Sequence, residues 1–173
     1  MTTEHKVFIG IGVATIILLV GGIFLLSNSG SSSSKSLMGQ AVSVTGRSHF
    51  PQGTPIDYST NPPAEGNHYP NPQPAGIYPT PPPDGNLVHS LEHGAVILWY
   101  NPKKLSSKQI DTVKNIFNKA PGDKDIMVAR TSMDVPLALT SWGRILKLNS
   151  IDEKTIDAFF NANVDQGPEQ APL

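Results

Sequence analysis

Four of the five histidines in this 173-residue chain lie between positions 49 and 93. Two of them, His89 and His93, enclose Glu92 in the string HSLEH. On a helical turn, positions i, i+3 and i+4 share one face, so the two imidazoles and the carboxylate can converge. Neutral imidazole is a common protein ligand for zinc and copper, and a nearby carboxylate can ligate the ion or orient a histidine. The spacing therefore favours a transition-metal site.

His68 and His49 could complete such a site from a Pro- and Gly-rich segment upstream. Metal ligation holds each nitrogen about 2.0–2.2 Å from one point, so ligand nitrogens lie roughly 3–4 Å apart. We therefore expect His68, His89 and His93 to converge at the start of an apolar strand, with His49 or Glu92 nearby. Copper or zinc is the expected ion.

The same histidines admit two other interpretations. They could form a structural network in which Glu92 fixes a tautomer. The string HxxEH is also the signature of inverted zinc metallopeptidases, in which the glutamate activates zinc-bound water. Gly94 and a strand follow at once, so the long helix of such peptidases is missing, and the candidate third ligand, Glu169, stands in a Gly-Pro tail. Binding or delivery of an ion is favoured over catalytic turnover.

The back half of the chain has regular hydrophobic periodicity that predicts an α+β domain. One small sheet should carry two helices, and a long ordered loop should precede them. Trp99, Trp142 and Met133 are expected to pack in the core, although the Met133 thioether could also bind copper. The expected elements are strands at 95–100 and 126–130, a hairpin of 137–140 with 145–148, and helices at 106–119 and 152–163.

The segment from 51 to 83 contains 11 of the 16 prolines. Such a composition is typical of a disordered linker. Tyrosines and a histidine between the prolines favour instead a long ordered loop packed on the rest of the domain, since long loops within a domain are usually functional or disordered.

Residues 7–26 form an uncharged apolar run of membrane-spanning length. An uncleaved anchor is the preferred interpretation; a cleaved signal peptide and a buried core helix are the alternatives. A tail at 1–6 precedes the run, and a Ser/Gly tether at 27–36 follows it. The globular domain is expected at 37–173, outside the cytoplasm in a single-pass cell-membrane protein.

Composition narrows the classes of partner. The formal net charge is −1 and Lys and Arg are not clustered, which argues against nucleic acid. The chain has no cysteine, which excludes disulfides and thiolate metal sites. The bilayer is the expected partner, bound through the N-terminal helix. The sequence does not decide whether a membrane protein is a partner as well. The main alternative to metal binding is an interaction or scaffold module whose histidines are structural.

Several strings resemble the motifs of one family. Residues 61–69 (NPPAEGNHY) look like a PPxSGxHY-type motif and residues 88–94 (VHSLEHG) like VHxLEHG, while 139–144 and 167–169 resemble the closing motifs. Together they resemble the domain of unknown function 3105, found in membrane-anchored microbial proteins, over about residues 37–172. At 64–65 this chain has Ala-Glu where the family more often has a small hydroxylated pair. The resemblance implies single-pass anchoring and a histidine-rich site, with no reaction attached; the matching positions are His49, His68, His89, Glu92 and His93.

Overall fold

A mixed sheet forms the centre of the computed structural model, which describes residues 36–120, 122–169 and 171–173. Its strand order is β1-β6-β5-β3-β4-β2. β3 and β2 run parallel to β4, whereas β5 and β6 pair antiparallel and join β3 to β1. The strands are β1 (Gln40–Ala41), β2 (Gly76–Tyr78), β3 (Ile97–Tyr100), β4 (Ile126–Ala129), β5 (Leu137–Ser141) and β6 (Arg144–Leu148).

Two helices begin at the caps that the sequence predicts. α3 (Ser107–Phe117) starts with a capping box between Ser106 and Gln109, and α4 (Glu153–Asn163) starts at Asp152, whose side chain accepts the Thr155 N–H. Such caps satisfy amide donors that have no partner within the helix. The predicted positions of both helices, of the β5–β6 hairpin and of the two central strands are confirmed.

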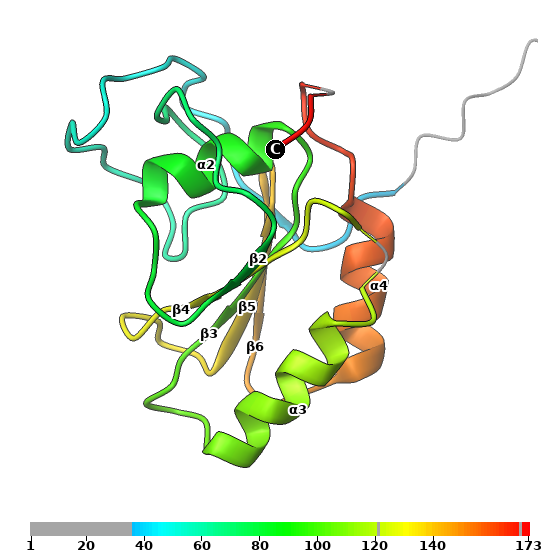
Figure 1. Cartoon of the computed structure of the whole chain (residues 1–173). Coiled ribbons are helices and arrows are strands. Elements are labelled where there is room, and N and C mark those ends of the chain that lie inside the picture. Colours follow the sequence, from blue (N-terminus) through cyan, green and yellow to red (C-terminus); the bar gives the residue numbers. More distant parts are fainter. Residues whose placement is uncertain (1–35, 121, 170) are drawn as a thin grey trace, which may run out of the picture. The chain divides into compact units, whose positions relative to one another are not determined.

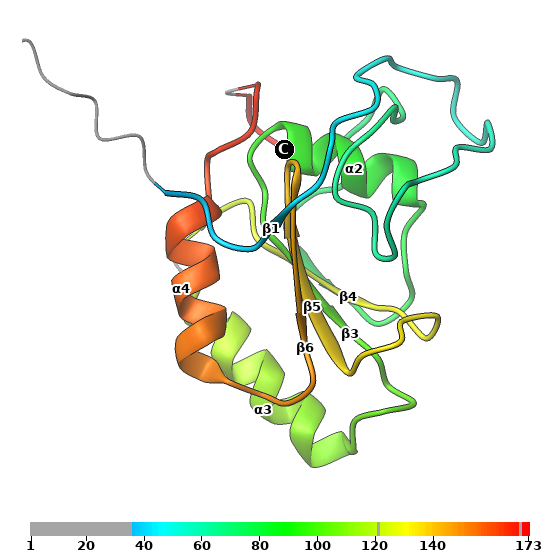
Figure 2. The same ribbon diagram turned by 180° about the vertical axis from the view of Figure 1, so that it is seen from behind.

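Alternation along the central strands divides the core into two layers. Leu98 and Tyr100 of β3 face α3 and α4, whereas Ile97 and Trp99 face the opposite side, where α2 packs. Successive side chains of a strand point to opposite faces, so a strand buried on both faces is apolar throughout. Figures 1 and 2 show α3 and α4 on one side of the sheet and α2 on the other.

A third helix, α2 (Asp84–Glu92), corrects the expectation of two helices. Its N-cap is Pro83, which makes no side-chain cap hydrogen bond. Residues 85–92 are all buried, so the helix has no polar face from which its period could be read. The short strands β1 and β2 were not expected either, because two or three residues carry too little alternation to be recognised.

The proline-rich segment has defined contacts, as expected of an ordered loop. The Tyr58 hydroxyl donates to the Asn67 carbonyl, and the Tyr69 hydroxyl donates to the Thr54 carbonyl. Glu65, buried in this segment, accepts hydrogen bonds from Thr45 and Ser59. The loop therefore packs on the residues before and after it and holds Tyr69 beside α2.

The core predictions hold for Trp99 and Met133, which are buried on the α2 face. Trp142 is only partly buried, because it lies in the β5–β6 turn and packs at the margin of that layer. Among the described residues, no helix is long and apolar enough to cross a membrane. The tail at 1–6, the anchor expected at 7–26 and nearly all of the tether at 27–36 lie outside the described residues.

The pKa of Asp125, just before β4, leads us to expect that the stability of the domain depends on pH. Burial raises its pKa from 3.8 to about 6; the Gly122 N–H opposes this, and Asp165 and Asp123 add to it. One carboxylate oxygen accepts from Gly122 and the other has no hydrogen-bond partner among the described residues. Because the pKa of Asp125 is raised in the folded state, folding is favoured while this carboxyl is protonated. This contribution to the free energy of unfolding is fully present below pH 3.8 and is lost as the pH rises through about 6.

We therefore expect Asp125→Asn, which keeps an acceptor for Gly122, to be more stable than the wild type above pH 6. The pKa change corresponds to a difference of about 3 kcal/mol at 1.36 kcal/mol per unit. Urea unfolding of both proteins between pH 4 and pH 7 measures this difference. A wild type and variant with parallel stability curves across that range would contradict the prediction.

Candidate metal centre

A short backbone bridge brings two loop histidines together. The Phe50 N–H donates to the His68 carbonyl (2.7 Å), and the His68 N–H donates to the Ser48 carbonyl (3.1 Å), which pairs His49 with His68 in parallel. The two imidazole centroids are 4.8 Å apart. His68 is fully buried, whereas His49 is exposed.

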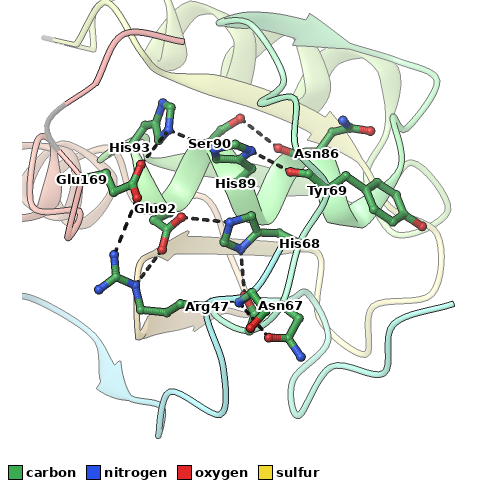
Figure 3. Close-up of polar contacts among 12 residues, drawn as sticks. Arg47, Asn67, His68, Tyr69, Asn86, His89, Ser90, Glu92, His93 and Glu169 are labelled. Atoms are coloured by element: carbon green, nitrogen blue, oxygen red, sulfur yellow. Dashed lines mark hydrogen bonds and ion pairs between the residues drawn. The ribbon is translucent and has the colours of Figure 1, made fainter. Parts of the chain in front are cut away.

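The C-terminal turn of α2 supplies the other candidate ligands. His89, Glu92 and His93 occupy the i, i+3 and i+4 positions, and the Nε2 atoms of His89 and His93 are 3.0 Å apart. The His89 ring centroid lies 4.7 Å from that of His68 and 4.5 Å from that of His93. His89 therefore stands between His68 and His93 (Figure 3). The predicted proximity to His89 holds for each of them, but His68 and His93 belong to separate groups of candidate ligand atoms rather than surrounding one point.

Three buried imidazoles are oriented in the same manner. The Nδ1 atoms of His68, His89 and His93 lie 3.0, 2.7 and 2.8 Å from backbone carbonyl oxygens. A carbonyl can only accept, so each Nδ1 carries the hydrogen and a neutral ring presents a lone pair at Nε2. A hydrogen bond from the distal ring nitrogen to a carbonyl is the usual way to orient a metal-bound histidine. The carbonyls belong to Gly66, Tyr69 and Pro172.

This orientation creates two short contacts between acceptor atoms. The Nε2 atoms of His89 and His93 face each other at 3.0 Å, and the His68 Nε2 lies 2.9 Å from a Glu92 carboxylate oxygen. The His68 Nε2 is buried, and its alignment with Glu92 does not make a hydrogen bond. Facing lone pairs repel unless a proton or a metal cation lies between them, so both contacts are compatible with a metal ion.

The pKa of His89 is lowered from 6.5. Burial is the largest cause, since it penalises the charged ring; the Tyr69 carbonyl opposes it, and the neighbouring His68 and His93 lower the pKa further. A lowered pKa keeps His89 neutral at pH 7, and the neutral ring is the form that binds a metal.

Arg47 is a member of the site that the sequence did not indicate. Its Nε donates to Glu92 at 2.7 Å, and its terminal nitrogen lies 3.9 Å from Glu169. Glu92 is almost completely buried, whereas Arg47 is about half exposed. The spacing to His49 is the signal that could have found it, because residues i and i+2 of an extended segment point the same way.

The C-terminal segment supplies Glu169. Its carboxylate lies 3.4 Å from the His93 Nε2, and its backbone N–H donates to the Glu92 carbonyl. Gly167 permits this approach, because a Cβ there would collide with the Glu92 carbonyl and the Gly94 nitrogen. Gly94 has a φ of +92° at the end of α2, which glycine adopts without strain. The tail thus lies directly against the helix end.

All five predicted site residues are brought together, in two groups that share His89. One group contains His49, His68, His89 and Glu92; the other contains His89, His93 and Glu169. Within each group, one candidate ligand atom per residue lies within 4.8 Å of all the others. Such distances are compatible with a common ion after small side-chain adjustments.

The contacts of Glu92 do not support the peptidase interpretation. A general base must reach the metal-bound water, but both Glu92 oxygens already face partners: Arg47 at 2.7 Å and His68 at 2.9 Å. A cavity of about 790 Å³ lies elsewhere, between β1, β6 and residues 59–61, and no histidine lines it. Glu92 is therefore placed to pair with Arg47 and to face the His68 Nε2 rather than to activate water.

Fold and site together define a small α+β domain whose histidines gather at the C-terminal end of one buried helix. The chain belongs to the family described as protein of unknown function (DUF3105), whose model matches residues 49–172. Neither the curated proteins nor the solved structures contain a significant match to this sequence.

Proposed function

We propose that this domain binds one copper or zinc ion at the histidine cluster, for binding or delivery rather than turnover. The observation that carries the proposal is the common orientation of His68, His89 and His93. Each gives its Nδ1 hydrogen to a carbonyl and directs Nε2 toward the shared space. The His68 Nε2 is a buried polar atom without a hydrogen-bond partner in the part of the chain that the structure describes, and a metal ion would satisfy it.

The donor set supports these metals over others. Imidazole nitrogen suits zinc and Cu(II), whereas magnesium and calcium prefer sets made of oxygen. Met133, the sulfur considered for Cu(I), packs in the core layer beneath α2. Nitrogen with one or two carboxylate oxygens is therefore the donor chemistry that the described residues offer.

The setting of the domain is also a proposal. Residues 7–26 would anchor it in the cell membrane with residues 37–173 outside the cytoplasm; the uncharged run and its length support this. Resistance of the protein to alkaline extraction from membranes, together with cleavage of its domain by added protease in intact cells, tests the arrangement. Release by alkali would refute the anchor.

Metal analysis of the full-length protein, purified without a histidine tag, tests the metal proposal. We expect one zinc or copper ion per chain after reconstitution and dialysis. Free metal at 100 times Kd should raise the free energy of unfolding by about 2.7 kcal/mol, because the ion binds the folded state. No stoichiometric ion and no stabilisation would overturn the proposal and leave the structural interpretation of the histidines.

A further inference from the structure

The two residue groups around His89 do not make two independent sites. His89 Nδ1 is engaged with the Tyr69 carbonyl, so a single ligating atom, Nε2, serves both groups. An imidazole nitrogen has one lone pair and binds one ion at a time. We call the group of His49, His68, His89 and Glu92 the loop position, and the group of His89, His93 and Glu169 the tail position.

We propose that these are alternative positions for one ion, which exchanges between them while His89 remains bound. This inference rests on the proposed function and adds how the ion moves within the site. The positions correspond to the two acceptor contacts, His68 with Glu92 at 2.9 Å and His89 with His93 at 3.0 Å. A cation would relieve either contact, and among the described residues no group of converging ligand atoms contains both His68 and His93.

The two positions differ in charge and exposure. In the loop position, His68 and Glu92 are buried and Arg47 already neutralises the Glu92 carboxylate. In the tail position, the Glu169 side chain is 43% exposed, and among the described residues the cation nearest to it is an Arg47 nitrogen at 3.9 Å. A tetrahedral ion bound by His89, His93 and Glu169 has one coordination place left. The tail position is thus suited to passing the ion to an outside ligand.

The exchange requires the ion to move only a short distance, because the ligands of the two positions are neighbours. His89 is the common ligand, so the ion has to leave the loop ligands and reach His93, whose Nε2 is already 3.0 Å from that of His89. Keeping one ligand bound throughout avoids full release of the ion into water. Glu169 lies on the segment that Gly167 seats against α2, so it is present on the tail side without large movement.

A matched pair of variants separates the positions. His68→Asn and His93→Asn each place an amide N–H near the original Nδ1, so the bonds to Gly66 and Pro172 can persist while Nε2 is lost. The full-length wild type, both single variants and the double variant are titrated with Co²⁺. Visible absorption then reports the ligand set, and thermal unfolding without metal verifies the fold.

We expect one Co²⁺ per wild-type chain. Each single variant should keep one Co²⁺ with an affinity reduced about twofold to tenfold, as when one of two comparably populated states is removed. Their spectra should differ, the wild-type spectrum should be a sum of the two, and the double variant should not bind. Two Co²⁺ per wild-type chain, or one single variant without effect and the other without binding, would overturn the inference. So would a loss above about 100-fold in both, which indicates one shared ligand shell. A wild type without any Co²⁺ would instead refute the proposed function.

Discussion

Substitution of His89 by Asn should reduce metal affinity by more than about 100-fold, the largest effect of any single change at the site. His89 is the residue shared by both ligand groups, so its loss removes a ligand wherever the ion lies. Asn keeps an N–H for the Tyr69 carbonyl, which His89 Nδ1 contacts at 2.7 Å. Isothermal titration of the full-length protein with Zn²⁺ measures the change.

Two comparisons make that result specific. His5→Ala, at a position outside the described residues, should bind Zn²⁺ as the wild type does. Thermal unfolding of metal-free His89→Asn should remain cooperative, which separates loss of a ligand from loss of the fold. A variant that binds Zn²⁺ with wild-type affinity would show that His89 is not a ligand, whereas an unfolded variant would favour a structural histidine network.

Replacement of Arg47 by Met should lower the free energy of unfolding by about 3 kcal/mol in metal-free protein. The substitution leaves the buried Glu92 carboxylate without the guanidinium that lies 2.7 Å away. Removing the partner of a buried carboxylate is costly because that charge stays desolvated, even where the partner, like Arg47, is half exposed. Urea denaturation with a chelator present gives the value, free of any contribution from bound metal.

The double variant Arg47→Met/Glu92→Gln should recover most of that loss, since no buried charge is left uncompensated. Lys119→Met supplies a matched control: it breaks an ion pair with Glu153 at 2.8 Å between exposed side chains. Exposed pairs contribute little, so its effect should be much smaller. Equal losses in Arg47→Met and Lys119→Met would mean that Glu92 has found another partner.

The helices and strands that the sequence predicted are those with a recognisable local pattern of apolar residues, caps or turns. α3 shows apolar positions at helical spacing behind a capping box, and β5 and β6 flank a tight turn at Gly143, whose φ is +66°. α2 lacks both signals, because its start is a proline without a side-chain cap and its residues are buried on every side. Its burial comes from the sheet on one side and from the proline-rich loop, tertiary contacts that periodicity does not report.

The candidate site likewise contains some residues that local spacing predicts and others that it does not. His89, Glu92 and His93 share one helical turn, so their spacing alone predicts their proximity. His68 was identified by its residue type, and its reach to His89 depends on the bridge between residues 48–50 and 67–69. Arg47 and Glu169 become part of the site through packing between segments that are far apart in the sequence. In particular, the close approach of Gly167 to α2 leaves no trace in the local sequence pattern.

The carbonyl that orients His93 belongs to Pro172, 79 positions further along the chain. During synthesis from the N-terminus, the helix and both loop histidines are therefore present long before the residue that fixes the His93 ring. Glu169 arrives equally late. The orientation of the His93 ring is therefore completed only after Pro172 has been synthesised and lies beside the end of α2, to which the Glu169 N–H also bonds.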